Sequence, residues 1–122
     1  EFHHTLLADG DFRDAEFANC TINDCSFKGS TLMGTTFREC VVTNVRFDHC
    51  VLKGAHFKQC EMKELSLKGA DMRFAEVDEA FLTAIKGGAV QHWKTAAWDP
   101  DVASKIKLST KDNERNMSAL GR

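Results

Sequence analysis

The sequence predicts an all-β solenoid, a coil of short strands, over about two thirds of its 122 residues. Every fifth residue from Leu7 to Leu82 is apolar, and the residue two positions earlier is small except at Val45 and Leu65. The residue two positions later is often Gly, Asn or Asp, which tolerate unusual backbone angles. A period of five matches neither the 3.6 residues of a helical turn nor the alternation of a flat strand, so it indicates a repeat architecture.

Within one repeat, the small residue and the large one after it lie two positions apart, so both point to the same side of an extended segment. The next inward pair starts three residues later, and the backbone must therefore turn a corner to keep its apolar side chains inside. We expect each repeat to be a short straight wall followed by a bend. The predicted core consists of the central residues Phe12, Phe17, Ile22, Phe27, Leu32, Phe37, Val42, Phe47, Leu52, Phe57, Met62, Leu67 and Met72.

Phenylalanine recurs at intervals of ten in the middle of the repeat, at Phe37, Phe47 and Phe57, with an aliphatic central residue between each pair. This secondary period requires an even number of walls in each turn of the coil. Four walls would place the phenylalanines on opposite sides.

The repeat resembles the pentapeptide-repeat family, whose loose consensus is a small residue, a polar residue, Leu or Phe, and two variable residues. It is seen in residues 15–19 (AEFAN), 55–59 (AHFKQ), 70–74 (ADMRF) and 80–84 (AFLTA), and the resemblance extends over sixteen consecutive repeats. It implies a right-handed quadrilateral β-helix with about 20 residues per coil, hence about four coils over residues 5–84. In that fold Phe17, Phe37 and Phe57 would form one stack, and Phe27 and Phe47 the stack that faces it.

The five cysteines all occupy the small inward position of a repeat. They are Cys20, Cys25, Cys40, Cys50 and Cys60. Ala and Ser fill the same position elsewhere, and free Cys packs as a small apolar residue. The odd count and the absence of metal-binding spacing favour reduced thiols, a cytoplasmic protein, and no metal or cofactor. No apolar run approaches the roughly 18 residues of a membrane-spanning helix.

The five-residue register fails after Ala84, at Lys86-Gly87-Gly88, so residues 85–122 are predicted to be a C-terminal capping segment with one or two short helices. Asp99-Pro100 has the form of an N-cap followed by Pro at the first helical position. A second helix is expected from near Thr110 through Met117 and Leu120 to Gly121.

Two phenylalanines of the last repeats, Phe74 and Phe81, fall at outward positions where an exposed aromatic ring is unusual. We expect Trp93 and Trp98 to cover them and to seal the open end of the coil. The alternative is that these four residues form a docking patch for a second subunit.

Nothing in the sequence supports catalysis, because it contains no paired carboxylates, no Gly-rich phosphate loop and no nucleophile with a base. Basic residues in the middle of the repeat are interleaved with acids, so direct binding of nucleic acid is not expected. The sequence therefore predicts a non-enzymatic scaffold that binds another macromolecule, most simply an unidentified protein. A homodimer through an end of the rod is a further expectation, because few residues precede the first repeat.

The resemblance also implies two alternatives to the scaffold function. Qnr and MfpA, members of the family, mimic duplex DNA, bind DNA gyrase and protect it from quinolones. Duplex DNA carries one charge per about 1.7 Å, so a rod of about 20 Å would need on the order of 12 net negative charges. Residues 5–84 carry a net charge of only −4, which ranks this function second. The other alternative is that the chain is the β-helical domain of a larger bacterial effector.

Overall fold

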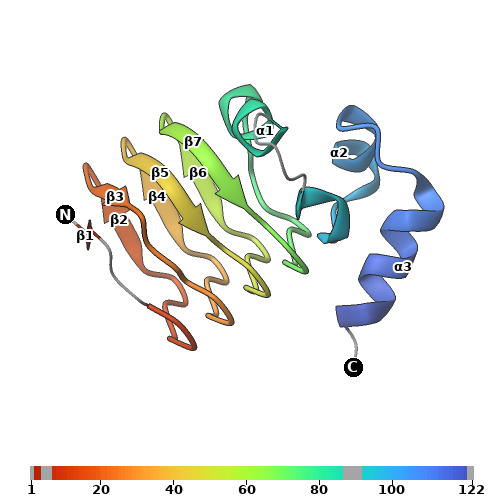
Figure 1. The fold of residues 1–122 in the computed structure, drawn as a ribbon, viewed down its shortest axis with the longest axis horizontal. Helices are drawn as coiled ribbons and strands as arrows, with labels where there is room; N and C mark the ends of the chain where they lie inside the picture. The colour runs from red at the N-terminus through yellow and green to blue at the C-terminus, as the bar shows by residue number, and fades with distance from the viewer. Residues whose placement is uncertain (1, 4–6, 87–91, 121–122) are drawn as a thin grey trace.

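The computed structural model describes residues 2–3, 7–86 and 92–120, so the predicted start of the repeat at Thr5 and the glycines at 87 and 88 lie outside the described residues. Parallel strands stack into a rod, and helices follow at its C-terminal end (Figure 1). One sheet contains β1 (Phe2–His3), β3 (Thr21–Asn23), β5 (Val41–Arg46) and β7 (Glu61–Ser66), in that order. The other contains β2 (Glu16–Ala18), β4 (Thr36–Arg38) and β6 (His56–Lys58).

Within each sheet, neighbouring strands pair with an offset of 20 residues, as in Glu16 with Thr36 and Thr36 with His56. Isolated bridges on the other walls show the same 20-residue offset, for example between Thr31 and Val51 and between Ser26 and Arg46. The parallel pairings therefore fall into four columns, each formed by one wall of successive turns. Backbone hydrogen bonds join the walls within each column, because each wall presents N–H and C=O groups to the wall in the turn before it and to the wall in the turn after it.

The corners between the walls have left-handed backbone angles, as the sequence predicts. Gly34 has φ 70°, and the predicted corner residues Asn19, Asp24 and Asn44 have φ between 51° and 55°. Phe74 occupies the same position with φ 63°. A bulky side chain is rare in this region, so Phe74 is held there by its surroundings at a cost in strain.

The phenylalanine stacks expected from the repeat are present inside the rod. Phe37 lies between Phe17 and Phe57, with ring centroids 5.0 and 4.9 Å away and ring planes within 8° of parallel. Phe27 and Phe47 form the facing stack at 5.3 Å. Ten of the thirteen central residues are buried, and the partly buried ones are Phe12, Phe17 and Met62. Phe12 and Phe17 lie in the first turns of the rod, where fewer residues cover them.

Hydroxyl and thiol groups at the small inward position form a regular set of hydrogen bonds between successive turns. Five of these groups donate to the backbone carbonyl of the central residue 23 positions earlier, whereas Cys20 and Cys25 donate to carbonyls two positions earlier. The pairs are Ser30 to Leu7, Thr35 to Phe12, Cys40 to Phe17, Cys50 to Phe27 and Cys60 to Phe37, with donor–acceptor distances of 2.6 to 3.3 Å. The small position thus selects for size and also for a hydrogen-bond donor.

Replacement of Thr35 by valine tests the contribution of these bonds. Valine keeps the shape of the buried side chain but removes its 2.6 Å hydrogen bond to the Phe12 carbonyl. We expect the free energy of unfolding to fall by about 1 to 2 kcal/mol, measured by urea denaturation. Thr31→Val is the matched control, because Thr31 lies on the outer face of the next wall and is only partly buried. Equal effects of the two substitutions would contradict this role.

The five-residue register predicts repeats through Ala84, but the chain leaves the solenoid at Asp78. Residues Glu79–Lys86 form helix α1, which packs against β7. The Asp78 carboxylate accepts a hydrogen bond from the Phe81 backbone N–H at 2.9 Å, as an N-cap residue does. The outward placement of Phe81 is therefore wrong, because the helix turns this ring inward, 4.7 Å from the ring of Phe57.

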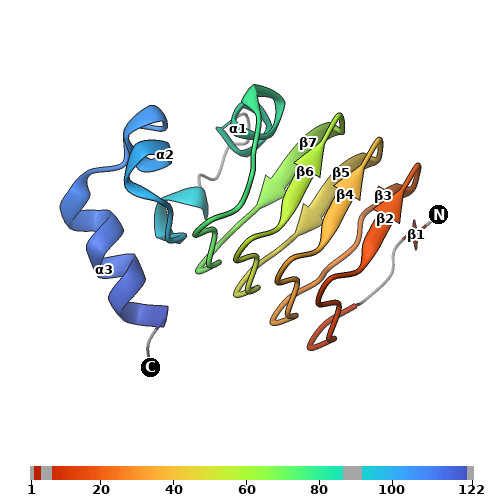
Figure 2. The same cartoon turned by 180° about the vertical axis from the view of Figure 1, so that it is seen from behind.

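The segment after α1 covers the C-terminal end of the rod (Figures 1 and 2). It contains the 3-10 helix η1 (His92–Thr95), α2 (Pro100–Lys105) and α3 (Thr110–Leu120). Asp99 and Pro100 begin α2 as the sequence predicts, and α3 covers the described part of the range expected for the second helix. No described helix has the length and apolar character needed to cross a membrane.

Trp93 and Trp98 are buried within the core cluster, but they do not cover Phe74, which is 66% exposed. The prediction that the capping segment hides Phe74 is wrong. The corner geometry directs this ring outward, where the Lys53 ammonium group lies 5.5 Å from its centroid. Cation–π contact of this kind stabilises an exposed ring by about 0.5 to 1 kcal/mol.

One column of the rod gains a further wall after α1. Ala97 pairs in parallel with Asp71, and the Met72 N–H donates to the Ala97 carbonyl at 2.8 Å. The next residue, Trp98, is capped by Asn113 of α3, whose amide accepts from the Trp98 N–H at 2.9 Å and donates to its carbonyl at 2.8 Å. The side-chain amide thus takes the place of a neighbouring strand and ends this column.

Candidate functional site

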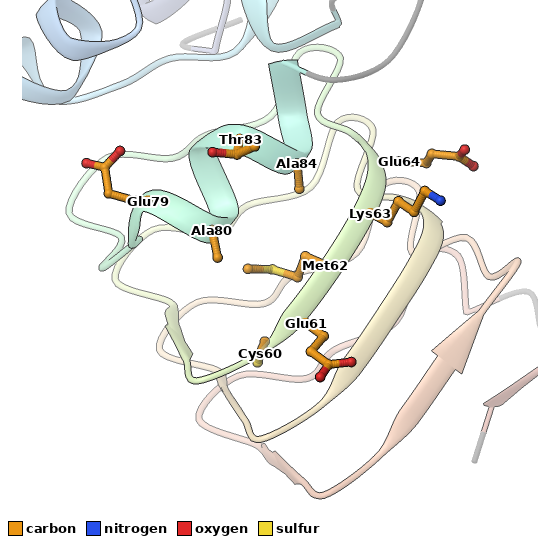
Figure 3. Close-up of a pocket in the computed structure, with 9 residues that line it drawn as sticks. All are labelled: Cys60, Glu61, Met62, Lys63, Glu64, Glu79, Ala80, Thr83 and Ala84. Carbon is orange, nitrogen blue, oxygen red and sulfur yellow. The ribbon is translucent and has the colours of Figure 1, made fainter.

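A groove of about 640 Å³ lies between strand β7 and helix α1 (Figure 3). One side is formed by Cys60, Glu61, Met62, Lys63 and Glu64, and the other by Glu79, Ala80, Thr83 and Ala84. The five-residue register predicts that Met62 lies in the core and Ala80 at an inward position, but it does not predict this groove. The groove forms because α1 replaces the wall that would otherwise stack on β7.

The floor of the groove is apolar and its helical side is formed by small side chains. Met62 is only partly buried and extends toward Ala80, while Ala84 points down from the next turn of the helix (Figure 3). Positions 80 and 84 lie on one face of α1, since residues four apart are neighbours on a helix. Because both are alanine, the helix leaves space above Met62 that larger side chains would fill.

The rim of the groove is acidic. Glu61, Glu64 and Glu79 are exposed, and Lys63 is the basic residue among the groove lining. Within the described part of the chain, none of these three glutamates forms an ion pair with a basic side chain. Their negative charges are therefore available to a bound molecule.

The groove also contains the free edge of a sheet, because β7 is the last strand of its sheet. The Glu61 N–H donates to the Cys40 carbonyl in the preceding turn, so the alternation of the strand directs the Met62 N–H the other way. Two turns earlier in the same column, the Asp24 N–H donates to the Thr43 carbonyl of the following turn. If this pattern continued, the Glu64 N–H would donate to the backbone carbonyl of residue 83, but Thr83 belongs to α1.

The four residues predicted as a cap or interface do not form one surface. Trp93, Trp98 and Phe81 are buried, and Phe74 is exposed at a corner of the rod. The groove residues could have been found from one sequence signal, the N-cap Asp78 followed by a helical face of alanines. That signal is obscured because Leu82 also satisfies the five-residue period.

The thiol nearest to the groove is not suited to nucleophilic chemistry. Cys60 is 6% exposed, and burial raises the pKa of its thiol, so the group stays protonated at neutral pH. Among the described residues, no three His, Cys, Asp or Glu side chains are placed to share a metal ion.

Burial should also make the protein sensitive to alkali. It raises the pKa of the Cys50 thiol from 9.0 to about 12. Between these values the unfolded chain releases the Cys50 proton and the folded chain keeps it, so stability present below pH 9 is lost as the pH rises. We expect Cys50 to lower the free energy of unfolding by about 1.4 kcal/mol per pH unit in this range.

Urea denaturation at several pH values between 8 and 11 measures this slope. Cys50→Ser is the matched control, because serine can keep the hydrogen bond to the Phe27 carbonyl but has no thiol to titrate. The wild type should lose stability more steeply than the variant. Identical slopes would show that the thiol does not titrate differently in the two states.

Comparison with known proteins supports the repeat architecture. The family model described as pentapeptide repeat region matches residues 1–76. No curated protein matches the chain in sequence. Among solved structures, a pentapeptide repeat protein from the thylakoid lumen of Arabidopsis thaliana is 17% identical, with a TM-score of 0.51 over 86% of this chain and 77% of that one. This likeness concerns the fold alone.

Two further structures are similar over shorter stretches. A trypsin-treated form of QnrB1, a plasmid-mediated fluoroquinolone resistance protein, is 24% identical with a TM-score of 0.44, over 62% of this chain and 46% of that one. HetL, a pentapeptide repeat protein involved in heterocyst differentiation regulation in the cyanobacterium Nostoc sp. strain PCC 7120, is 19% identical with a TM-score of 0.40, over 57% of this chain and 33% of that one. The chain thus spans less than half the length of either protein.

Proposed function

Because the chain belongs to the family of pentapeptide-repeat proteins, we propose that it is a non-enzymatic scaffold that binds another protein. The groove between β7 and α1 carries this proposal, since it combines a sheet edge, an apolar floor and an acidic rim. Such a surface offers backbone, apolar and charged contacts together, which an extended protein segment can satisfy along its length.

A rigid rod is a suitable support for such a site. We propose that the repeat is a right-handed, four-sided β-helix of about four coils, a form supported by the 20-residue offset between paired strands. The phenylalanine stacks fill its interior, so binding is left to the outer faces and the ends. The five free cysteines support a reducing compartment such as the cytoplasm.

Site-specific photo-cross-linking tests the proposal. A benzophenone amino acid in place of Thr83, which is exposed in the groove, should cross-link to a discrete protein partner. The matched control carries the same group in place of Lys111, an exposed residue on α3 away from the groove. Cross-linking at both positions alike, or at neither, would overturn the assignment of the groove as the binding site.

The DNA-mimicking alternative has weaker support. Mimicry needs dense, unneutralised negative charge along the rod. In the acidic first turn, Asp11 is paired with Arg13 at 2.7 Å, and Glu16 with Arg38 at 3.3 Å. We therefore expect no effect of the purified protein on gyrase supercoiling, with or without a quinolone. Inhibition or drug protection at low micromolar protein would favour this alternative over the scaffold, and the full reading frame would test the effector-domain alternative.

A further inference from the structure

We propose that the groove takes its partner by strand addition, in which an extended basic segment of another protein pairs with the free edge of β7. This inference rests on the proposed function and specifies how the partner is held and what chemistry it has. Strand addition to an exposed sheet edge is a general mode of peptide recognition, in which backbone hydrogen bonds supply affinity and side-chain positions supply specificity.

Two columns of the rod end differently at its C-terminal side, one at Trp98 and the other at β7. At Trp98 the column ends on the amide of Asn113, and Asn116 donates to the carbonyls of Lys94 and Ala96 at 2.8 and 2.9 Å. At β7 the next strand is replaced by α1, which packs against β7 but leaves a groove of about 640 Å³ over Met62. Natural proteins normally cover such edges, because they pair readily with other chains. Beside Met62, the edge of β7 faces this groove instead of another strand.

The backbone of β7 offers hydrogen-bonding groups to an added strand. β7 spans six residues and bends at Glu64, a corner residue with φ 59°, so an added strand would follow the same bend. The column pattern directs the Met62 and Glu64 N–H groups toward the groove. An added strand would continue the stacking of this column, at about 4.8 Å from β7. Its inward side chain would lie over Met62 and beneath Ala80 and Ala84, where a small apolar residue such as alanine or valine fits the space.

Charge decides which segment fits. Glu61 and Glu64 of the strand and Glu79 of the helix outnumber Lys63, so the groove attracts a basic segment. Opposite charges on neighbouring strands stabilise the pairing, and like charges weaken it. The N-terminal end of a second copy does not match this charge, because its first repeats are acidic, with Asp9, Asp11 and Asp14. The occupant is therefore a different protein with alternating basic and small apolar residues.

A blocked peptide of about seven residues that alternates lysine and valine, labelled with fluorescein, is the probe. Fluorescence anisotropy should detect salt-dependent binding, and NMR should place the largest amide shifts at Met62 and Glu64. The same peptide with every second backbone nitrogen methylated keeps its side chains but loses strand pairing. It should bind at least about tenfold more weakly, a loss equivalent to one or two hydrogen bonds.

Variants of the protein locate the contact. The double variant Glu61→Lys/Glu64→Lys should weaken binding by about tenfold, whereas Glu114→Lys, an exposed change of the same charge on α3, should leave it unchanged. Ala80→Trp should fill the groove and abolish binding. Circular dichroism and thermal melting of each variant check that the fold is intact.

The outcomes separate the two proposals. Equal binding of the methylated and unmethylated peptides would overturn strand addition but leave the groove as a docking site. Peptide binding that survives Ala80→Trp would place the contact elsewhere and overturn the inference. Failure of the peptide to bind, with cross-linking at position 83 retained, would also overturn strand addition while the scaffold function stands.

Discussion

Replacement of Phe37 by aspartate is expected to abolish folding. The Phe37 side chain is fully buried, stacked between Phe17 and Phe57 and in edge contact with Phe27 and Phe47. Loss of a buried phenylalanine alone costs about 3 to 5 kcal/mol. A carboxylate in the same place adds the desolvation of an unpaired charge, several kcal/mol more. The sum is comparable to the whole stability of a small domain, about 5 to 15 kcal/mol.

Far-UV circular dichroism and thermal melting measure this effect. The matched control is Met33→Asp, which introduces the same carboxylate four positions away at a side chain that is 41% exposed. We expect the control to fold with a melting temperature close to that of the wild type. A soluble Phe37→Asp protein that melts cooperatively would refute the inward assignment of the central residues.

Replacement of Asn113 by leucine is expected to destabilise the C-terminal end of the rod strongly. Asn113 is 4% exposed and forms hydrogen bonds with both the N–H and the carbonyl of Trp98. Leucine has a similar size but cannot form either bond, and two buried backbone groups would be left without partners. We expect a loss of about 2 to 5 kcal/mol, since each unsatisfied buried group costs about 1 to 3 kcal/mol.

The measurement is urea denaturation combined with hydrogen exchange at the Trp98 amide, which should become much less protected. Asp112→Ala on the same helix is the control, because it removes only a partly exposed ion pair with Arg115 and should cost less than about 1 kcal/mol. If Asn113→Leu melted like this control, the amide would not be closing the sheet edge. Aggregation of the variant would agree with exposure of an unpaired edge.

The different endings of the two columns separate stability from binding. The edge at Trp98 is closed by two buried asparagines, so it belongs to the folding of the cap. The edge at β7 faces a groove lined by small and acidic side chains, so it is available for a partner. Variants at Asn113 should therefore change stability, and variants at Glu61 and Glu64 should change binding.

The sequence by itself determined the interior of the rod. The period of five specifies which residue points inward and which one turns the corner, because each repeat touches only its neighbours at a constant offset. The left-handed corners at Asn19 and Gly34 follow from that period. The stacks of Phe37 with Phe17 and Phe57 follow once the 20-residue coil implied by the family resemblance is added.

Only the tertiary structure decided where the repeat ends and what its end presents. Leu82 fits the five-residue period and also the apolar face of a helix, and the choice depends on the Asp78 cap and on the packing of Phe81 against Phe57. The bond from Asn113 to Trp98 joins residues 15 positions apart in no regular pattern. The end of a solenoid is formed by such single contacts, which do not repeat, and a periodic signal therefore cannot predict them.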